Sequence, residues 1–507
     1  MTTLLLDGRS LCIADVVAVA DARQHVDLAP SARARMRTTR AVVNRAVASG
    51  VPVYGVNTGF GKLSEVTIPG SQLAALQRNL VRSHAAGVGD PLPEREVRAM
   101  MLLRANVLAT GFAGARAMVV DALLGMLNAG IWAVVPEQGS VGASGDLAPL
   151  AHLALTLIGE GRARLGGIED DSSVLLATVG LAPVVLEAKE GLALINGTQA
   201  HTAVASLACA ELTRLWHVAH IATAMSLDAL LGTPDAFDAR IQEARGQPGQ
   251  KVSAALLRAL LTKSDIRESH RFGDPRVQDA YALRCAPQVH GPAYEALCFA
   301  QDIIERELNA ATDNPLVLES GELLSGGNFH GQAVGMAADV LAIITANLAV
   351  ISERRTDRLV HPDFNQGLPP FLAGSPGLES GFMMAQVTAA ALASECKTLA
   401  HPASVDSIPT DGNKEDVVPM AMAAATKLRR TVRNLRHVLA IELIAAAEGL
   451  EYRRPLRSSE PLERAHALIR TIVRKADGDR PPAPDITQLA NALATGTFDG
   501  ITDGLVT

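Results

Sequence analysis

Cysteine, aromatic residues and positive charge are all scarce in this chain of 507 residues. The five cysteines are scattered and form no C-x-x-C pair, so we expect neither a disulfide framework nor a zinc site, and a reducing compartment such as the cytoplasm. Aromatic residues make up only 3% of the chain, whereas alanine and leucine recur throughout, which favours close-packed helices over sheets. The net charge of −7 argues against nucleic acid or an anionic membrane as the partner.

Signals for export or membrane insertion are also lacking. The N-terminus, MTTLLLDGRS, has no basic segment followed by a long apolar run, so no signal peptide is expected. The stretch from Ala333 to Ile351 nearly reaches membrane-spanning length, but Asp339 and Asn347 interrupt it. We therefore expect a buried central helix there rather than a membrane span.

Long segments with helical periodicity and few breaks dominate the rest of the chain. They predict a mainly α fold, with a long central helical bundle and a smaller N-terminal lobe of short helices, loops and minor β structure. We expect three consecutive parts: an N-terminal lobe (1–200), the central bundle with active-site loops (201–457) and a C-terminal helical tail (458–507). Helices are expected at about 72–83, 96–130, 147–158, 198–231, 288–311, 330–357, 380–398 and 416–450.

The stretch Gly139–Leu147, GSVGASGDL, is small, rich in glycine and followed at once by an apolar run. Asp146 fits the N-cap of the helix that follows, so Ala143-Ser144-Gly145 should lie at a helix N-terminus, where anions are favoured. The stretch is not a hydrolase G-x-S-x-G elbow, because Asp146 takes the fifth position, and it lacks the Lys-Ser/Thr pair of a phosphate loop. A tight turn that leads into a helix is the plain interpretation.

A chemical interpretation of Ala143-Ser144-Gly145 is also open. Small residues allow the Gly145 nitrogen to approach the Ala143 carbonyl, and loss of water from the ring and from Ser144 would leave a methylidene-imidazolone (MIO), a strong electrophile. The stretch resembles the prosthetic-group loop of the aromatic amino acid ammonia-lyase family of MIO-dependent lyases and aminomutases, most closely its histidine-specific branch. Several separate motifs carry the resemblance, from about Pro52 to about Met420.

A polar motif, QDAYALR at residues 278–284, carries candidate binding residues. Gln278, Tyr281 and Arg284 are spaced three apart and would share one face of a helix. Such spacing is typical of a solvated helical stripe, or of a carboxylate clamp in which Arg284 supplies a planar fork and Gln278 adds hydrogen bonds. The resemblance assigns Arg284 to the substrate carboxylate and Tyr281 to assistance with proton transfer.

Three further residues have a plain structural explanation beside a functional one. Taken alone, Asn196 is a turn residue before a helix, His84 is a structural histidine near a helix end, and Glu415 belongs to a surface charge cluster. The resemblance places Asn196 and Phe329 beside the prosthetic group. It also implies that His84 and Glu415 orient an imidazole ring, since a carboxylate accepts a hydrogen bond from imidazole N–H.

The resemblance implies that the protein removes ammonia from L-histidine and releases trans-urocanate. The group formed from Ala143-Ser144-Gly145 would serve as the acceptor for the substrate amine. Tyr54, beside a glycine-rich loop, is the candidate general base, which requires a lowered pKa. No metal and no diffusible cofactor is required. The resemblance further implies a homotetramer whose active sites combine segments near Tyr54, Ser144 and Tyr281 from three subunits.

Some residues depart from the pattern of the histidine-specific enzymes, so tyrosine and phenylalanine remain alternative substrates. Lys414 replaces a usual Gln, the tripeptide 417–419 reads Val-Val-Pro instead of His-Val-Ser, and His201 stands where a small polar residue is usual. The alternative is the same chemistry on tyrosine or phenylalanine, as an ammonia-lyase or a 2,3-aminomutase. Ser83-His84 does not decide between them, whereas Glu415 favours histidine because the phenylalanine and tyrosine enzymes usually carry Gln there.

Two alternatives from other classes fit the sequence less well. A fumarase-like lyase typically carries a flexible G-S-S-x-M-P-x-K-x-N loop, which is absent from the sequence. A non-catalytic helical scaffold descended from such enzymes would be expected to have lost Ser144, Tyr54 or Arg284, and all three are present.

Overall fold

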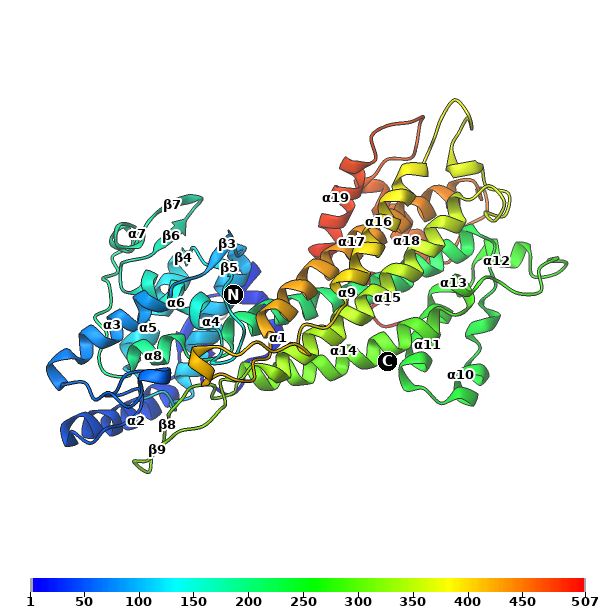
Figure 1. The fold of residues 1–507 in the computed structure, drawn as a ribbon. Helices are drawn as coiled ribbons and strands as arrows, with labels where there is room; N and C mark the ends of the chain where they lie inside the picture. Colours follow the sequence, from blue (N-terminus) through cyan, green and yellow to red (C-terminus); the bar gives the residue numbers. More distant parts are fainter. Residues whose placement is uncertain (1–2, 506–507) are drawn as a thin grey trace. The chain divides into compact units, whose positions relative to one another are not determined.

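The computed structural model describes residues 3–505, whose contacts divide them into two compact units. Each unit draws on segments far apart in the sequence, as the mixed colours of Figure 1 show. The three consecutive parts expected from the sequence are a different partition, and they stay a prediction. The first unit comprises the described residues up to Ala210 with Ala300–Asp339 and Pro402–Thr426, and the second comprises Glu211–Phe299, Val340–His401 and the described residues from Lys427 onward.

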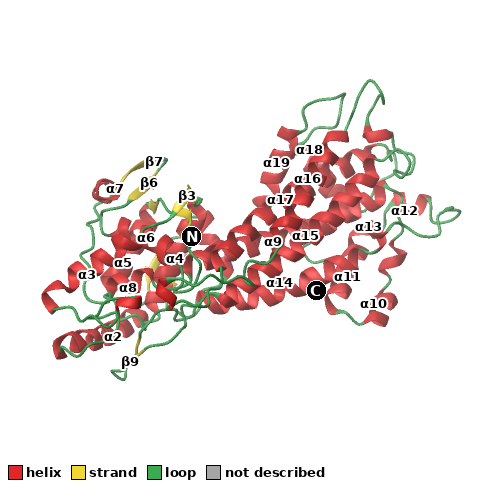
Figure 2. Ribbon diagram, viewed as in Figure 1, coloured by secondary structure: helices red, strands yellow, loops and turns green. Residues whose placement is uncertain are grey.

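Helices make up most of both units, and the strands are short (Figure 2), which confirms the predicted mainly α fold. All strands of residues 3–505 belong to the first unit, where β1 pairs with β2, β3 with β5, β6 with both β4 and β7, and β8 with β9. The helices confined to the first unit are α1 Ile13–Asp21, α2 Pro30–Ser49, α3 Leu73–His84, α4 Glu94–Ala109, α5 Ala117–Ala129, α6 Leu147–Leu157, α7 Ser172–Thr178 and α8 Glu190–Ile195. The strands are β1 Leu4–Leu6, β2 Val26–Leu28, β3 Val88–Pro91, β4 Trp132–Ala133, β5 Pro136–Gln138, β6 Arg162–Leu165, β7 Ile168–Asp171, β8 Leu316–Val317 and β9 Leu323–Leu324.

Four long helices each contribute residues to both units. Most of α9 is buried, as expected of a helix that is apolar on nearly every side, whereas α14 contains Pro292 and α17 carries many charged residues. The four are α9 Gln199–Ala229, α14 Ala286–Leu308, α15 Gln332–Val360 and α17 Ala421–Glu451. The helices confined to the second unit are α10 Ala239–Arg245, α11 Pro248–Leu261, α12 Asp265–Ser269, α13 Tyr281–Arg284, α16 Met383–Leu399, α18 Glu460–Ile472 and α19 Ala483–Ala494. Single 3-10 turns are η1 Gly61–Leu63, η2 Gly70–Gln72, η3 Pro234–Phe237, η4 Pro370–Leu372, η5 Asp411–Asn413 and η6 Asp499–Ile501.

Helix α15 contains the apolar stretch that nearly has membrane-spanning length. Among the described residues it is the one helix long and apolar enough to cross a bilayer. However, 72% of its most apolar window is buried inside the protein. This burial matches the expected central helix, because the core helix of a globular protein has the same composition as a membrane span.

The start of α6 shows where local sequence rules hold and where they fail. The helix begins directly after Asp146, as predicted, but the Asp146 carboxylate makes no capping hydrogen bond to the helix backbone. It is instead fully buried and binds Ser140 and His201. The position of the helix start was therefore correctly predicted, but the role of Asp146 as a side-chain cap was wrong.

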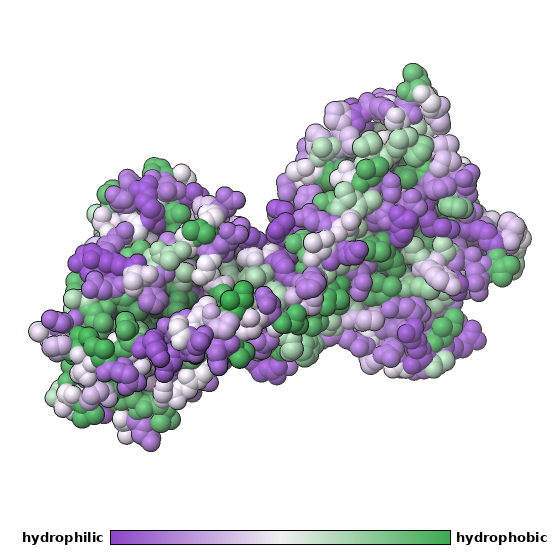
Figure 3. All heavy atoms as spheres, in the orientation of Figure 1, coloured by the Kyte–Doolittle hydropathy of each residue, from purple (hydrophilic) through white to green (hydrophobic). Residues whose placement is uncertain are grey.

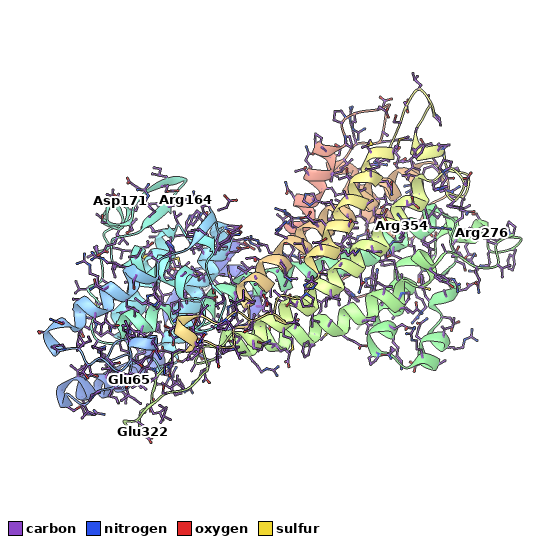
Figure 4. The ribbon with its side chains drawn as sticks, in the orientation of Figure 1. Glu65, Arg164, Asp171, Arg276, Glu322 and Arg354 are labelled. Atoms are coloured by element: carbon purple, nitrogen blue, oxygen red, sulfur yellow. The ribbon has the colours of Figure 1, made fainter. Side chains whose placement is uncertain are left out.

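The predicted helical stripe of Gln278, Tyr281 and Arg284 is also wrong. Helix α13 contains only four residues, and its N-cap Ala280 has an extended backbone, so Gln278 lies outside the helix. The segment before α13 is held by Arg276, labelled in Figure 4, which pairs with Asp274 at 2.7 Å and with Asp279 at 3.4 Å. These ion pairs favour a loop where the spacing alone indicated a helix.

Candidate active site

Two adjoining cavities in the first unit meet around the predicted prosthetic-group tripeptide. Their volumes are about 600 Å³ and about 510 Å³. The larger cavity also contains His84 and Asn196, and the smaller one contains Ala143 and Phe329. The side chains of most of the predicted site residues therefore lie around one region, although they come from segments far apart in the sequence. Both cavities are lined by Tyr54, Gly61, Ser144, Asp411 and Glu415.

The C-terminal side of the tripeptide is held against the segment before α9. Gly145 forms a parallel bridge with Gly197, and the Asp146 backbone N–H donates to the Gly197 carbonyl at 2.7 Å. A Cβ atom on Gly145 would lie 2.0 Å from the Gly197 oxygen, and Gly145 has a positive φ of 70°. Only glycine fits this position, because any side chain would meet backbone that cannot move aside.

The N-terminal side of the tripeptide is held in the same way by the start of α15. The backbone N–H of Gly331 donates to the carbonyl of Gly142 at 2.9 Å. Gly142 also has a positive φ, 75°, and a Cβ atom there would lie 2.8 Å from the Ala421 side chain. The three residues 143–145 are thus fixed at both ends by backbone hydrogen bonds to other segments.

Asn196, at the end of α8, contacts the tripeptide directly. Its side-chain N–H donates to the Ser144 carbonyl at 2.9 Å, while its own side-chain oxygen is buried and has no hydrogen-bond partner among the described residues. The Asn196 backbone carbonyl accepts two hydrogen bonds of 3.1 Å from the Arg104 guanidinium. Burial lowers the pKa of Arg104 to about 10, so the group stays cationic at neutral pH. Asn196 is therefore held by a buried cation rather than by a simple turn.

Glu415 contacts the side chain of Ser144, whereas Asn196 contacts its backbone carbonyl. One carboxylate oxygen accepts a hydrogen bond from the Ser144 hydroxyl, and the other accepts one from the Thr410 hydroxyl at 2.6 Å. Backbone hydrogen bonds between Thr410 and Glu415 of 2.9 and 3.4 Å close the loop that carries them. Glu415 is partly buried, whereas its neighbours Lys414 and Asp416 are exposed. It is thus a directed acceptor at the cavity, and the interpretation as a surface charge cluster does not describe it.

Tyr54 and His84 line the larger cavity, and burial shifts both of their pKa values. Burial raises the pKa of Tyr54, and the charges of Asp411 and Glu415 raise it further, whereas hydrogen bonding to the Gly61 backbone acts in the opposite direction. The net upward direction is opposite to the lowered pKa that a general base requires. Burial lowers the pKa of His84, so this imidazole is neutral at physiological pH.

Gln278, Tyr281 and Arg284 belong to the second unit, and none of them lines either cavity. The Arg284 guanidinium lies over the Tyr281 ring, 4.6 Å from its centroid, which is a cation–π contact. Tyr281 is 70% exposed. An exposed aromatic ring paired with an arginine is available to bind an external group.

Some lining residues were missed by sequence reasoning. Asp411 lines both cavities, and Asn314 lines the smaller one, where its side-chain oxygen accepts from Ser325 at 3.1 Å and from the Gly326 backbone at 2.9 Å. Lys414, whose orientation the sequence left open, lines the smaller cavity. Nothing in the sequence pointed to Asp411. Residues 3–505 contain no group of three or more His, Cys, Asp or Glu side chains placed to hold a metal ion.

Comparison with known proteins gives consistent matches over nearly the whole chain. The sequence model of the family described as aromatic amino acid lyase matches residues 11–471. A relative named histidine ammonia-lyase from Anaeromyxobacter sp. (strain K) is 54% identical over 98% of this chain and 100% of its own length. The crystal structure of histidine ammonia-lyase from Trypanosoma cruzi is similar, with a TM-score of 0.93 and 40% identity over 100% of this chain and 96% of that one. Tyrosine aminomutase from Streptomyces globisporus also has a TM-score of 0.93, with 36% identity over 99% of this chain and 98% of that one.

Proposed function

Because the chain belongs to the aromatic amino acid lyase family of carbon–nitrogen lyases, we propose that it eliminates ammonia from L-histidine and releases trans-urocanate. The observation that carries the substrate assignment is the position of Glu415. Its carboxylate hydrogen-bonds Ser144, and both residues line a cavity with the neutral His84. An imidazole ring presents N–H donors, which a carboxylate and the lone pair of a neutral histidine can accept.

The family is MIO-dependent, and the residues around positions 143–145 fit that group. Gly145 lies where no Cβ can be accommodated, Asn196 donates to the Ser144 carbonyl, and the Asn196 side-chain oxygen still lacks a partner. Ser144 lies between both cavities, where a substrate can reach it. We propose that Ala143-Ser144-Gly145 forms the MIO group, which supplies an electrophile for the substrate amine.

The tautomer of His84 follows from its contacts. Its Nδ1 lies 2.9 Å from the Leu80 carbonyl, and a carbonyl only accepts, so Nδ1 carries the proton. Nε2 is then an acceptor for the N–H of a substrate ring. A protonated substrate ring has two N–H groups, so His84 Nε2 can accept from one and the Glu415 carboxylate from the other, and the two residues together orient the ring.

Tyr54 is the proposed base for the β-proton of the substrate. Since burial and nearby carboxylates raise its pKa in this chain, the assembled enzyme must bring positive charge to Tyr54. Arg284, which contacts Tyr281 and binds nothing in either cavity, is the candidate for that charge and for the substrate carboxylate. Gln278 adds hydrogen bonds to the carboxylate, Tyr281 assists proton transfer, and Phe329 packs against the prosthetic group.

A homotetramer with active sites shared among three subunits would supply these residues. Apolar side chains occur at several places on the surface drawn in Figure 3. Helix α15 exposes Met336, Ile343 and Val350 by 42%, 41% and 48%, and these residues recur every seven positions, as in a helix seam that packs against another helix. We propose that copies of this chain cover the seam and that the enzyme acts in the cytoplasm.

The purified native protein, incubated separately with L-histidine, L-tyrosine and L-phenylalanine, tests the proposal. We expect the ultraviolet absorbance of an α,β-unsaturated acid to appear with L-histidine, together with ammonia. The Ser144→Ala variant should fold with an unchanged Tm and lose this activity. Turnover of tyrosine without histidine would refute the substrate, and a β-amino acid product would identify an aminomutase instead.

A further inference from the structure

A buried histidine–aspartate pair lies next to the tripeptide, and neither residue lines the two cavities. His201 Nδ1 lies 2.8 Å from Asp146 Oδ2, and both side chains are completely buried. The His201 backbone N–H donates to the same oxygen at 2.9 Å, and the Ser140 hydroxyl donates to the other at 2.7 Å. Burial alone would raise the pKa of Asp146, but the charge and hydrogen bonds of His201 and Ser140 outweigh it and lower the pKa. Asp146 is thus held as a carboxylate within the core.

The His201 ring also contacts the opposite end of the tripeptide. A Cβ atom on Gly331 would lie 2.6 Å from His201 Cε1 and 2.8 Å from Nε2, so the ring covers the Gly331 backbone. Gly331 is the residue whose N–H binds the Gly142 carbonyl. One imidazole therefore contacts Asp146, which follows the tripeptide, and Gly331, which holds the residue before it.

Helix α9 makes this contact rigid, because His201 lies in its first turn and is fully buried. The arrangement is costly, because the Asp146 carboxylate is removed from water and His201 Nε2 has no hydrogen-bond partner among the described residues. Apolar residues at both positions would pack there without this cost, since a buried carboxylate and its partner seldom add stability over apolar packing. The pair is therefore better explained by the geometry that it imposes than by the stability that it adds.

We propose that His201 is a positioning residue for formation of the MIO ring. By contacting both Asp146 and Gly331, its side chain fixes the distance between the two ends of Ala143-Ser144-Gly145 and so promotes ring closure. This inference rests on the proposed function. In ring closure the Gly145 nitrogen bonds to the Ala143 carbonyl carbon, and the carbonyl oxygen leaves as water with the N–H protons of Gly145 and Ser144. A second water leaves with the Ser144 hydroxyl and the Ser144 α-proton. No oxidant or reductant takes part. Ring closure therefore depends on the approach of the Gly145 nitrogen to the Ala143 carbonyl carbon, and a small displacement of either atom slows it strongly.

Two variants separate the contributions of His201. His201→Asn keeps an N–H donor near the position of Nδ1 but removes the ring from Gly331, whereas His201→Ala removes both contacts. The matched control is His220→Ala, because His220 is also fully buried on α9, and its Nε2 contacts the Ser253 hydroxyl at 2.7 Å. Each full-length protein is purified natively and measured by intact mass, circular dichroism and thermal unfolding.

The readout is the fraction of chains that lack the mass of two water molecules. We expect nearly all wild-type chains to lack it, a fall of about tenfold or more in this fraction for His201→Ala, and an intermediate value for His201→Asn. His220→Ala should lower Tm and leave the fraction unchanged. A full loss of water in folded His201→Ala, or a loss that follows Tm in both His201→Ala and His220→Ala, would overturn the inference. Wild-type chains without any loss of water would instead refute the proposed function.

Discussion

The side-chain amide of Asn196 donates a 2.9 Å hydrogen bond to the carbonyl of Ser144, while the hydroxyl of the same serine donates to Glu415. Ser144 is therefore held between a donor and a carboxylate acceptor. Arg104 in turn fixes Asn196 through its backbone carbonyl. The contacts leave the Ser144 carbonyl as the atom at which negative charge can be stabilised by a preorganised N–H.

Replacing Asn196 with Ala should lower kcat for L-histidine by about 10²-fold, the usual effect of removing one such donor. Asn196→Asp, which replaces the donor with a negative charge, should be at least as damaging. Steady-state kinetics and intact mass together show whether the defect lies in turnover or in formation of the prosthetic group. The control is Asn44→Ala, since Asn44 is exposed on α2. Equal kcat in Asn196→Ala and the wild type would contradict the role of the donor.

Glu415→Gln should reduce kcat/KM for L-histidine by about 10- to 100-fold, because a charge-assisted hydrogen bond of about 1.5–3 kcal/mol becomes a neutral one. The effect should be smaller for L-phenylalanine, whose ring has no N–H. The ratio of the two kcat/KM values is the measurement. Exposed Glu319→Gln is the control. An unchanged ratio would remove the main support for histidine as the substrate.

Gly145→Ala should prevent loss of water at the tripeptide. Its Cβ would lie 2.0 Å from the Gly197 oxygen, so the two segments must separate. Gly180→Ala is a matched control, because Gly180 has a similar φ of 76° and no atom within 4 Å of its Cβ position. It should lose only about 1 kcal/mol of unfolding free energy through backbone strain. Intact mass and Tm distinguish the variants, and similar values for both would count against the close approach.

The helices and their ends could largely be predicted from the sequence, because local interactions decide them. Gly130 ends α5 with a positive φ of 79°, and α6 begins directly after Asp146. The segment at Gln278 could not be predicted, because its loop depends on the ion pairs of Arg276. The spacing of residues alone does not show whether a short polar segment is helical, because ion pairs with neighbouring residues can stabilise a loop there instead.

Most residues of the candidate site could be predicted from the sequence, but the contacts between them could not. The small residues around Ser144 pointed to close backbone approach, and the resemblance supplied His84, Asn196, Phe329 and Glu415. No pattern in the sequence showed that Glu415 binds the Ser144 hydroxyl, since 271 positions separate them. The direction of the Tyr54 pKa could not be predicted, because burial depends on tertiary packing that the sequence does not display.

Stability should also depend on pH through Asp228, near the end of α9. Burial raises its pKa to about 6, although hydroxyls of Ser264 and Ser458 donate to one of its oxygens. Because the folded pKa lies above the ordinary pKa of 3.8, the protonated carboxyl stabilises the fold fully at pH values below 3.8, and this contribution is lost as pH rises through about 6. The shift corresponds to at most about 3 kcal/mol.

Asp228→Asn, which cannot ionise, should therefore gain Tm relative to the wild type as pH rises, with the difference levelling off above about pH 6. Thermal unfolding across this pH range is the measurement. The exposed Asp363→Asn variant should follow the wild type at every pH. A Tm difference between Asp228→Asn and the wild type that stays constant with pH would exclude this role of Asp228.

The tripeptide is held by Gly197, Gly331 and Glu415, which come from three distant parts of the chain. If the tripeptide forms the MIO group as proposed, a nascent polypeptide whose synthesis has not reached residue 415 lacks one of the residues that hold the tripeptide for ring closure. The reactive electrophile would then arise only inside a finished protein, so that free thiols and amines of the cell never meet it on an unfolded chain.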